Sequence, residues 1–210
     1  MAHPLLTRDG LYAITDGPRD DLVDACAAAI EGGAVLLQYR DKTGDDVRRL
    51  AEARALATLC GRHRIALIVN DDVELAAASG ATGVHLGEAD ADIAAARARL
   101  GAHAIIGASC YDSLERARKL AAAGADYLAF GAFHPSPTKP HARSATPQLL
   151  REAKTLGIPL VAIGGITPAN GAPLIEAGAN YLAVISSVFG VADVRAAARE
   201  FAALFPASRS

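Results

Sequence analysis

Residues 176–182, Glu-Ala-Gly-Ala-Asn-Tyr-Leu, pass from a helical pattern through a glycine into an apolar run. The same junction occurs at residues 122–128, Ala-Ala-Gly-Ala-Asp-Tyr-Leu, and in looser form at residues 78–84, Ala-Ser-Gly-Ala-Thr-Gly-Val. Glycine tolerates the left-handed conformation that ends many helices, so the next residues can enter a strand at once. These repeats of one helix-to-strand junction favour a fold in which strands and helices alternate.

Short apolar, β-rich runs recur along the chain, with alanine-rich helical patterns between them. The runs are Leu11–Thr15, Val35–Arg40, Ile65–Asn70, Gly83–Leu86, Ala104–Ser109, Tyr127–Gly131, Leu160–Gly164 and Tyr181–Ser186. Near-continuous hydrophobic runs are expected of parallel strands that are covered on both faces. Eight strand–helix units predict the α/β class and a single-domain (β/α)8 TIM barrel over residues 1–210. An open doubly wound sheet is the main alternative, but no dinucleotide-binding glycine motif follows the first strand.

The composition limits the classes of function. Hydrophobic residues make up 51% of the 210 residues, so we expect an ordered chain. The formal net charge of −2 gives no general attraction to nucleic acid or to anionic membranes, so neither is an expected partner. No apolar run approaches the roughly 20 residues of a membrane span, and the N-terminus lacks the apolar core of a signal peptide. Cys26, Cys60 and Cys110 fit no metal spacing and are interpreted as reduced thiols of a cytoplasmic protein. Small-molecule substrates are the expected partners, and a homodimer is left open.

The stretch Ser136-Pro137-Thr138-Lys139 follows the sixth apolar run and precedes a helix. Two hydroxyls donate hydrogen bonds to phosphate oxygens, and a lysine adds a point charge. The stretch therefore predicts a binding site for a phosphorylated ligand. An ordinary surface loop built from turn-forming residues is the alternative.

Other polar residues end the second strand run, where the active sites of such barrels form. Strand alternation puts Gln38 and Arg40 on one face, and Lys42 continues that face if the chain stays extended. Two cations and an amide suit a ligand with several phosphoryl charges. The alternative is an ion pair inside the barrel, between Arg40 and Asp41 or an acid from another strand.

Carboxylates follow the third and fourth runs. Asp71 and Asp90 would supply one acid from each of two adjacent strand ends, and Mg²⁺ favours a few carboxylates completed by water and ligand phosphates. The alternative is helix capping by Asp71 or Asp72 and by Asp90 or Asp92, since helices begin there.

Glycines and serines end the last two runs. Gly164, Gly165 and Ile166, together with the serines at Ser186 and Ser187, can present backbone N–H groups and hydroxyls to a phosphate. A tight turn alone is the alternative for the two glycines. Ser109, after the fifth run, is either a ligand hydroxyl or a helix cap, and His85 is either a site residue or a core histidine.

Together these motifs resemble the thiamine-phosphate synthase family. The matching stretches are L-Y-A-I-T-D (11–16), Q-Y-R-D-K (38–42), L-I-V-N-D-D (67–72), G-V-H-L-G-E-A-D (83–90), I-I-G-A-S (105–109), G-A-F-H-P-S-P-T-K-P (131–140), V-A-I-G-G-I (161–166) and A-V-I-S-S-V-F (183–189). The series is specific, although each stretch alone is weak. Two departures are Glu88-Ala89-Asp90, where Gln-Glu-Asp is commoner, and His134, where Phe is frequent.

The resemblance implies a transferase of thiamine biosynthesis that joins 4-amino-2-methyl-5-(diphosphooxymethyl)pyrimidine to a thiazole phosphate or its carboxylated tautomer. By analogy, the pyrimidine diphosphate would be bound by Gln38, Tyr39, Arg40, Asp41, Lys42, Asn70, Ser109 and Lys139. The thiazole phosphate would be bound by Ser136, Pro137, Thr138, Gly165, Ile185 and Ser186. One Mg²⁺ would lie on Asp71 and Asp90, and the expected catalytic residues are Arg40, Lys42 and Lys139.

The implied chemistry is dissociative. Diphosphate leaves, the aminopyrimidine delocalises the positive charge, and the thiazole nitrogen captures the carbocation to give thiamine phosphate. No protein nucleophile is required. A thiazole tautomerase of the same fold is the alternative, but it would not need the set of Lys42, Asp71 and Asp90. A catalytically silent ligand-binding relative and an unrelated phosphate-binding barrel are further alternatives.

Overall fold

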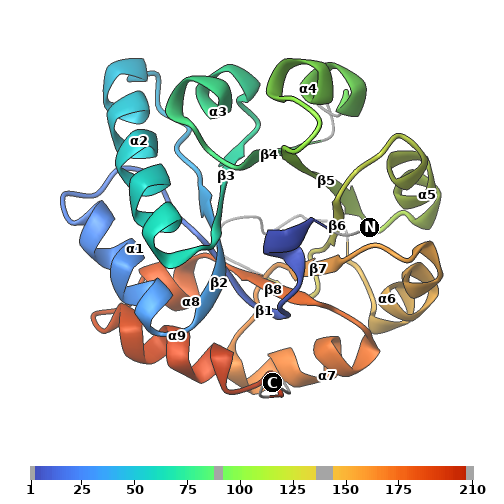
Figure 1. The fold of residues 1–210 in the computed structure, drawn as a ribbon. Coiled ribbons are helices and arrows are strands. Elements are labelled where there is room, and N and C mark those ends of the chain that lie inside the picture. The colour runs from blue at the N-terminus through green and yellow to red at the C-terminus, as the bar shows by residue number, and fades with distance from the viewer. Residues whose placement is uncertain (1–2, 88–91, 136–143, 207–210) are drawn as a thin grey trace.

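The computed structural model describes residues 3–87, 92–135 and 144–206. Within these residues, eight parallel strands close into a barrel in the order β1 to β8, and β8 pairs with β1 (Figure 1). The strands are β1 (Gly10–Ile14), β2 (Ala34–Tyr39), β3 (Ala66–Asn70), β4 (Gly83–Leu86), β5 (Ile105–Tyr111), β6 (Tyr127–Phe130), β7 (Leu160–Ile163) and β8 (Tyr181–Val184). The predicted (β/α)8 TIM barrel is therefore confirmed.

Helices surround the barrel, as Figure 1 shows. They are α1 (Leu22–Glu31), α2 (Asp46–His63), α3 (Val73–Ser79), α4 (Ile93–Leu100), α5 (Leu114–Ala122), α6 (Pro147–Ala153), α7 (Pro168–Ala177), α8 (Ser186–Phe189) and α9 (Val194–Ala202). Two short 3₁₀ turns are η1 (Pro4–Leu6) and η2 (Lys154–Leu156). Among the described residues, no helix is long and apolar enough to cross a membrane.

Alternation along the strands produces two apolar layers. Side chains such as Leu37 and Phe130 point outward and pack against the helices, whereas Leu36, Ile68 and Tyr127 fill the barrel interior. Successive strand residues face opposite sides, so both layers come from the same short runs. Because both faces are covered, the strands are almost entirely buried, as their hydrophobic composition predicts.

The N-terminal segment closes one end of the barrel. Leu6, in η1, is only 4% exposed and packs with the interior cluster. Figure 1 shows this turn over the barrel axis. The opposite end, where the strands finish, is the end at which barrel enzymes build their sites.

The strand boundaries agree with the predicted runs to within two residues. The last run, predicted to extend to Ser186, ends instead at Val184. Ile185 has φ −108° and ψ −88°, which leaves the extended region, and Ser186 begins the short helix α8. The serines predicted at a strand end therefore lie at the start of a helical turn.

Candidate active site

A pocket of about 610 Å³ lies over the ends of β2 and β3. Its lining residues are Asp41, Lys42, Thr43, Arg49, Asn70, Asp71, Asp72, Val73 and Glu74. Four residues that the sequence predicted for a diphosphate or a metal therefore border one pocket: Asp41, Lys42, Asn70 and Asp71. They come from two adjacent strand ends, because parallel strands finish at the same rim of a barrel.

Asp71 is the centre of a small polar cluster in this pocket. Lys42 Nζ lies 3.7 Å from Asp71 Oδ2, and Asn70 Nδ2 donates to the same oxygen at 2.6 Å. The side chains of Lys42 and Asp71 are 63% and 34% exposed. A cation and a carboxylate are thus both accessible to a ligand that enters the pocket.

The backbone explains why Asp71 is directed into the pocket. Its φ is +61°, in the left-handed region that Asp and Asn adopt more readily than most residues. Its amide still donates to the His85 carbonyl at 2.8 Å, so the turn begins directly at the strand end. Asp72, rather than Asp71, caps α3, because its carboxylate accepts from the Leu75 amide at 2.8 Å. Asp72 also pairs with Arg49 at 2.9 Å. The capping alternative for Asp71 is therefore wrong.

The end of β2 is tied to the end of β1 through Thr15. The Arg40 amide donates to Thr15 Oγ1 at 2.8 Å, and that hydroxyl donates to the Arg40 carbonyl at 3.1 Å. The Arg40 guanidinium lies 3.9 Å from Asp16 and does not pair with Asp41. Gln38 points into the barrel and is 3% exposed. The structure thus keeps Gln38 and Arg40 on the inner side, as alternation predicts.

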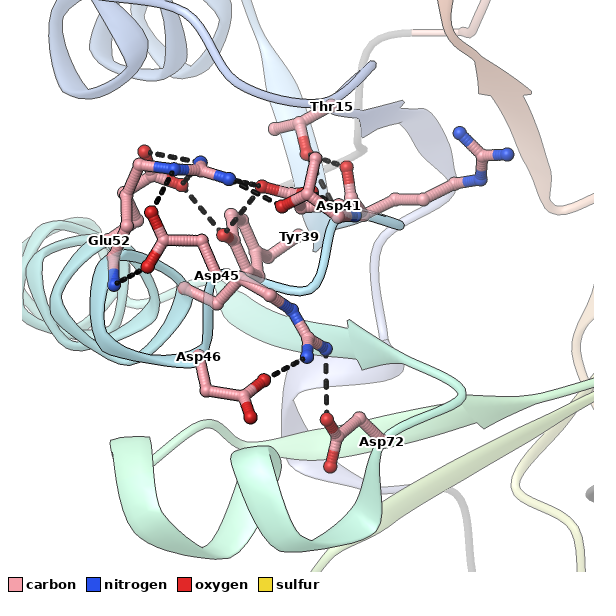
Figure 2. Close-up of polar contacts among 11 residues, drawn as sticks. Thr15, Tyr39, Asp41, Asp45, Asp46, Glu52 and Asp72 are labelled. Atoms are coloured by element: carbon pink, nitrogen blue, oxygen red, sulfur yellow. Dashed lines mark hydrogen bonds and ion pairs between the residues drawn. The ribbon is translucent and has the colours of Figure 1, made fainter.

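Tyr39 and Asp41 point the other way, toward α2. The Tyr39 hydroxyl donates to Glu52 at 2.6 Å, and Arg48 donates to Asp41 at 2.7 Å. Figure 2 shows Tyr39, Asp41, Asp45 and Glu52 gathered around one guanidinium group. Burial of the Asp41 carboxyl opposes ionisation, but hydrogen bonds from Thr43 and Arg48 outweigh it and lower the pKa of Asp41. The structure therefore places these two predicted ligand residues against α2, and their binding roles stay predictions.

A chain of hydrogen bonds crosses the barrel interior. Gln38 Nε2 donates to the Tyr12 hydroxyl at 2.6 Å, and the hydroxyls of Tyr12 and Tyr127 are 2.9 Å apart. The Tyr127 hydroxyl lies 3.0 Å from His85 Nδ1, and His85 Nε2 lies 2.9 Å from Ser109 Oγ. Two residues predicted for the pyrimidine, Gln38 and Ser109, are thus the ends of one connected chain. The sequence analysis missed both tyrosines.

Ser109 is not a helix cap. The cap of α5 is Ser113, whose hydroxyl accepts from the Arg116 amide at 3.1 Å. Arg116 Nε donates to the Ser109 carbonyl at 2.8 Å and so ties the end of β5 to its helix. Ser109 is half-buried and its hydroxyl contacts His85, which makes His85 part of the polar interior rather than an isolated core residue.

The ends of β7 and β8 form a second part of the rim. Gly164 and Gly165 have φ values of +106° and +60°, and a Cβ on Gly165 would lie 2.5 Å from the Pro135 carbonyl oxygen. Both positions therefore need glycine for the backbone itself, whatever ligand they bind. Ile185 packs against the interior cluster, and Ser186 is exposed beside it.

Several predicted residues lie outside the described residues: Asp90, Ser136, Pro137, Thr138 and Lys139. The neighbouring Asp92 caps α4 by accepting from the Ala95 amide at 2.8 Å. Within residues 3–87, 92–135 and 144–206, no group of three or more His, Cys, Asp or Glu side chains could hold a metal. Asp71 is the one predicted metal ligand that the described part contains.

Comparison with known proteins decides the family. The family model described as thiamine monophosphate synthase matches residues 11–188, which is most of the chain. The chain belongs to this family. The match runs from the start of the barrel into the short helix α8, so it covers every strand.

Individual members of the thiamine monophosphate synthase family are similar over nearly their whole length. The thiamine-phosphate synthase of Chromobacterium violaceum is 56% identical over 201 residues, which cover 95% of this chain and 97% of that protein. The thiamine-phosphate synthase of Xanthomonas campestris pv. campestris is 53% identical, with 93% and 95% covered. The solved thiamine phosphate pyrophosphorylase of Pyrococcus furiosus has a TM-score of 0.86 and 35% identity, with 95% and 96% covered.

The comparisons confirm the resemblance that the sequence motifs indicated. Relatives named as synthases at this identity indicate that the chain is an enzyme. The roles of individual residues, the metal and the substrates stay predictions.

Proposed function

We propose that this chain is a thiamine-phosphate synthase. It would join 4-amino-2-methyl-5-(diphosphooxymethyl)pyrimidine to a thiazole phosphate, releasing diphosphate and thiamine phosphate. The observation that carries the proposal is the cluster of Lys42, Asn70 and Asp71 in a single pocket, in a chain of the thiamine monophosphate synthase family. A cation, an amide and an acid at one rim suit a diphosphate that arrives with a divalent cation.

The leaving diphosphate would be held by the cations of the rim. Lys42 is exposed and only loosely paired with Asp71, so its ammonium can turn to phosphate oxygens. Arg40 is likewise held at 3.9 Å from Asp16, a distance too long for a tight ion pair. These groups would neutralise the negative charge that develops as the carbon–oxygen bond breaks, and Lys139 would join them.

Mg²⁺ fits the donor set at this rim. Asp71 offers an accessible carboxylate, and Asp90 is the second acid expected from the sequence. Mg²⁺ is commonly bound by one or two carboxylates plus substrate phosphates, so a cluster of three protein ligands is not required. When bound, the ion would supply charge neutralisation on the diphosphate.

The pyrimidine would lie over the barrel interior, between Gln38 and Ser109. Apolar residues and neutral phenols line that interior, and burial raises the pKa values of Tyr12 and Tyr127. A cation formed there would meet little water, which protects it from hydrolysis. The thiazole phosphate would be bound at Gly165, Ile185 and Ser186, where phosphate sites recur in this fold, together with Ser136, Pro137 and Thr138.

The thiols are poor candidates for a covalent step. Cys26, Cys60 and Cys110 are all buried, and burial raises the pKa of each thiol to about 12. They are therefore protonated near neutral pH and are weak nucleophiles. This supports a reaction in which the thiazole nitrogen attacks the pyrimidine carbon directly.

The test is product formation measured by mass spectrometry. Purified protein is mixed with the pyrimidine diphosphate and the thiazole phosphate, either with Mg²⁺ or with EDTA. Thiamine phosphate and diphosphate formed only with Mg²⁺ would support the proposal and the metal. Folded protein that makes no product in either condition would overturn the proposal. Product that forms equally well in EDTA would overturn only the proposed requirement for Mg²⁺.

A further inference from the structure

We infer that Tyr12, Tyr127 and His85 are positioning residues that decide which atoms Gln38 and Ser109 offer to the pyrimidine. The inference rests on the proposed function, and it assigns roles to three residues that contact the ligand only through others. The chain of four hydrogen bonds from Gln38 to Ser109 carries it.

The chain is rigid and shielded from water. Tyr12 and Tyr127 are 1% and 0% exposed, and their rings meet edge to face with centroids 5.9 Å apart. The His85 ring stacks on Tyr127 with an angle of 17° between the ring planes. Buried polar groups carry a large cost when they lose a partner, so each member restricts its neighbours to one arrangement.

Gly107 preserves the position of Tyr127. A Cβ at residue 107 would lie 1.9 Å from Tyr127 Cζ, so any side chain there would displace the phenol. Gly107 pairs with Tyr127 in the sheet register. Glycine within a strand commonly marks such a close approach, here of an aromatic ring.

The proton positions along the chain are coupled. Each tyrosine hydroxyl has one proton to donate, so a Gln38 amide that donates to Tyr12 directs the Tyr12 proton to Tyr127 and the Tyr127 proton to His85 Nδ1. His85 Nε2 then carries the ring proton and donates to Ser109 Oγ. The Ser109 proton is left to point at a ligand.

When the protons run from Gln38 toward Ser109, Gln38 offers an acceptor to the ligand and Ser109 offers a donor. Gln38 uses its Nε2 inside the barrel, and no hydrogen bond to its Oε1 is found among the described residues, so this oxygen can accept from a ligand. Ser109 becomes a donor. An aminopyrimidine carries an amino group that donates and ring nitrogens that accept. The coupled ends therefore match an aminopyrimidine, and the opposite direction of the chain would present the reversed pair.

The kinetic test uses Tyr127→Phe and Tyr12→Phe, which remove the hydroxyls and keep the rings. Tyr181→Phe is the matched control, because Tyr181 belongs to the same interior cluster and its buried hydroxyl has no hydrogen-bond partner in the described residues. For the first two variants, we expect KM for the pyrimidine diphosphate to rise about fivefold to tenfold, the scale of one hydrogen bond. KM for the thiazole phosphate should stay unchanged, as should all parameters of Tyr181→Phe.

The outcomes separate this inference from the proposed function. A wild-type enzyme that turns over, with KM changes in Tyr127→Phe and Tyr12→Phe no larger than those in Tyr181→Phe, would overturn the inference alone. A fall in kcat with both KM values unchanged would do the same, since it would mean that the two hydroxyls act in the transition state and not in binding the pyrimidine. A folded wild type that neither binds nor converts the pyrimidine diphosphate would overturn both.

The tautomer of His85 gives a test that does not depend on activity. Nitrogen-15 NMR at about pH 8, above the ordinary histidine pKa of about 6.5, would assign the ring proton. His85→Asn identifies the signal. A proton on Nε2 in the wild type supports the direction inferred above. A proton on Nδ1 would mean that Ser109 donates to His85, and it would overturn the inference.

Discussion

Two regions of the candidate active site, the charged rim at the ends of β2 and β3 and the hydrogen-bonded chain inside the barrel, use different interactions. At the rim, Lys42 and Asp71 are partly exposed and lie 3.7 Å apart. In the interior, the chain from Gln38 to Ser109 contains phenols whose pKa values are raised by burial. Water and ligand phosphates can compensate charges at the rim, whereas burial penalises the charged form of any group inside.

The difference indicates a division of labour between the two regions. The rim suits the diphosphate, a ligand group with several charges. The interior suits the neutral aminopyrimidine, which is recognised by oriented hydrogen bonds more than by charge.

The largest effect is expected from Asp71→Asn at the rim. Loss of a carboxylate that we propose to hold Mg²⁺ beside the leaving group should lower Mg²⁺-dependent turnover by at least about a hundredfold, the scale of one electrostatic contact in a transition state. The neighbouring variant Asp72→Ala should instead lower the free energy of unfolding by about 1 kcal/mol, because Asp72 caps α3. Turnover per folded molecule and urea unfolding separate the two. The reverse pattern would make Asp71 a structural residue.

The next largest effect is expected from the ion pair between Arg48 and Asp41, which lies below the rim and should contribute to the free energy of unfolding. Arg48→Met removes the partner of Asp41, whose side chain is 0% exposed. Removing one member of such a pair leaves the buried carboxylate without its cation, so we expect a clear loss of unfolding free energy in urea.

The control for Arg48→Met is Arg99→Met. Arg99 and Glu74 pair at 2.7 Å with side chains that are 50% and 73% exposed, so the loss should be much smaller than in Arg48→Met. Equal losses in the two variants would mean that Arg48 is an ordinary surface residue.

The same buried pair predicts a pH dependence. The folded state lowers the pKa of Asp41, so its ionised form contributes stability above the unfolded pKa of about 3.9. That contribution should be lost as the pH falls below about 4 toward the lower folded pKa. The difference in unfolding free energy between the wild type and Asp41→Asn should therefore shrink from pH 6 to pH 3. A constant difference over that range would mean that the hydrogen bonds from Thr43 and Arg48 do not lower the pKa of Asp41 in the folded state.

The smallest effect is expected from Tyr181→Phe in the interior. Its hydroxyl has no partner among the described residues, so the free energy of unfolding should change by less than about 0.5 kcal/mol or rise. Tyr127→Phe should lose about 1 kcal/mol or more, because it leaves neighbours unpaired. Thermal unfolding of both variants checks this, and equal losses would show that the interior chain adds no stability.

Much of the fold could be predicted from the sequence. Runs of β-rich residues and glycine-ended helices located all eight strands, since burial on both faces requires such runs. Two runs missed the strand end by two residues: the fifth strand extends past Ser109 to Tyr111, and the eighth ends at Val184 instead of Ser186. Ile185 and Ser186 are compatible with a strand, and only the backbone turn at Ile185 shows that the strand has ended.

The candidate site was predictable only in part. Strand ends alone indicated that Lys42, Asn70 and Asp71 meet, because parallel strands finish together. Alternation puts Tyr39 outward, as found, yet the motif suggested a ligand role for it. The i,i+4 spacing of Arg48 and Glu52 predicts an ion pair on one helix face, and this pair could have indicated the hydrogen-bond partner of Tyr39, which is Glu52.

The interior chain could not be read from the sequence. Which hydroxyls meet across a barrel depends on the stagger between strands, which a list of strand residues does not contain. The one signal was Gly107, a glycine within an apolar strand, which turns out to make room for Tyr127.

The division of labour can be tested by calorimetric titration of Lys42→Met and Tyr127→Phe with two ligands in Mg²⁺, inorganic diphosphate and the pyrimidine diphosphate. We expect Lys42→Met to weaken the binding of both ligands. Tyr127→Phe should weaken only the pyrimidine diphosphate and bind inorganic diphosphate as the wild type does. Equal weakening of both ligands by Tyr127→Phe, or unchanged diphosphate binding by Lys42→Met, would contradict the assignment of charge to the rim and of orientation to the interior.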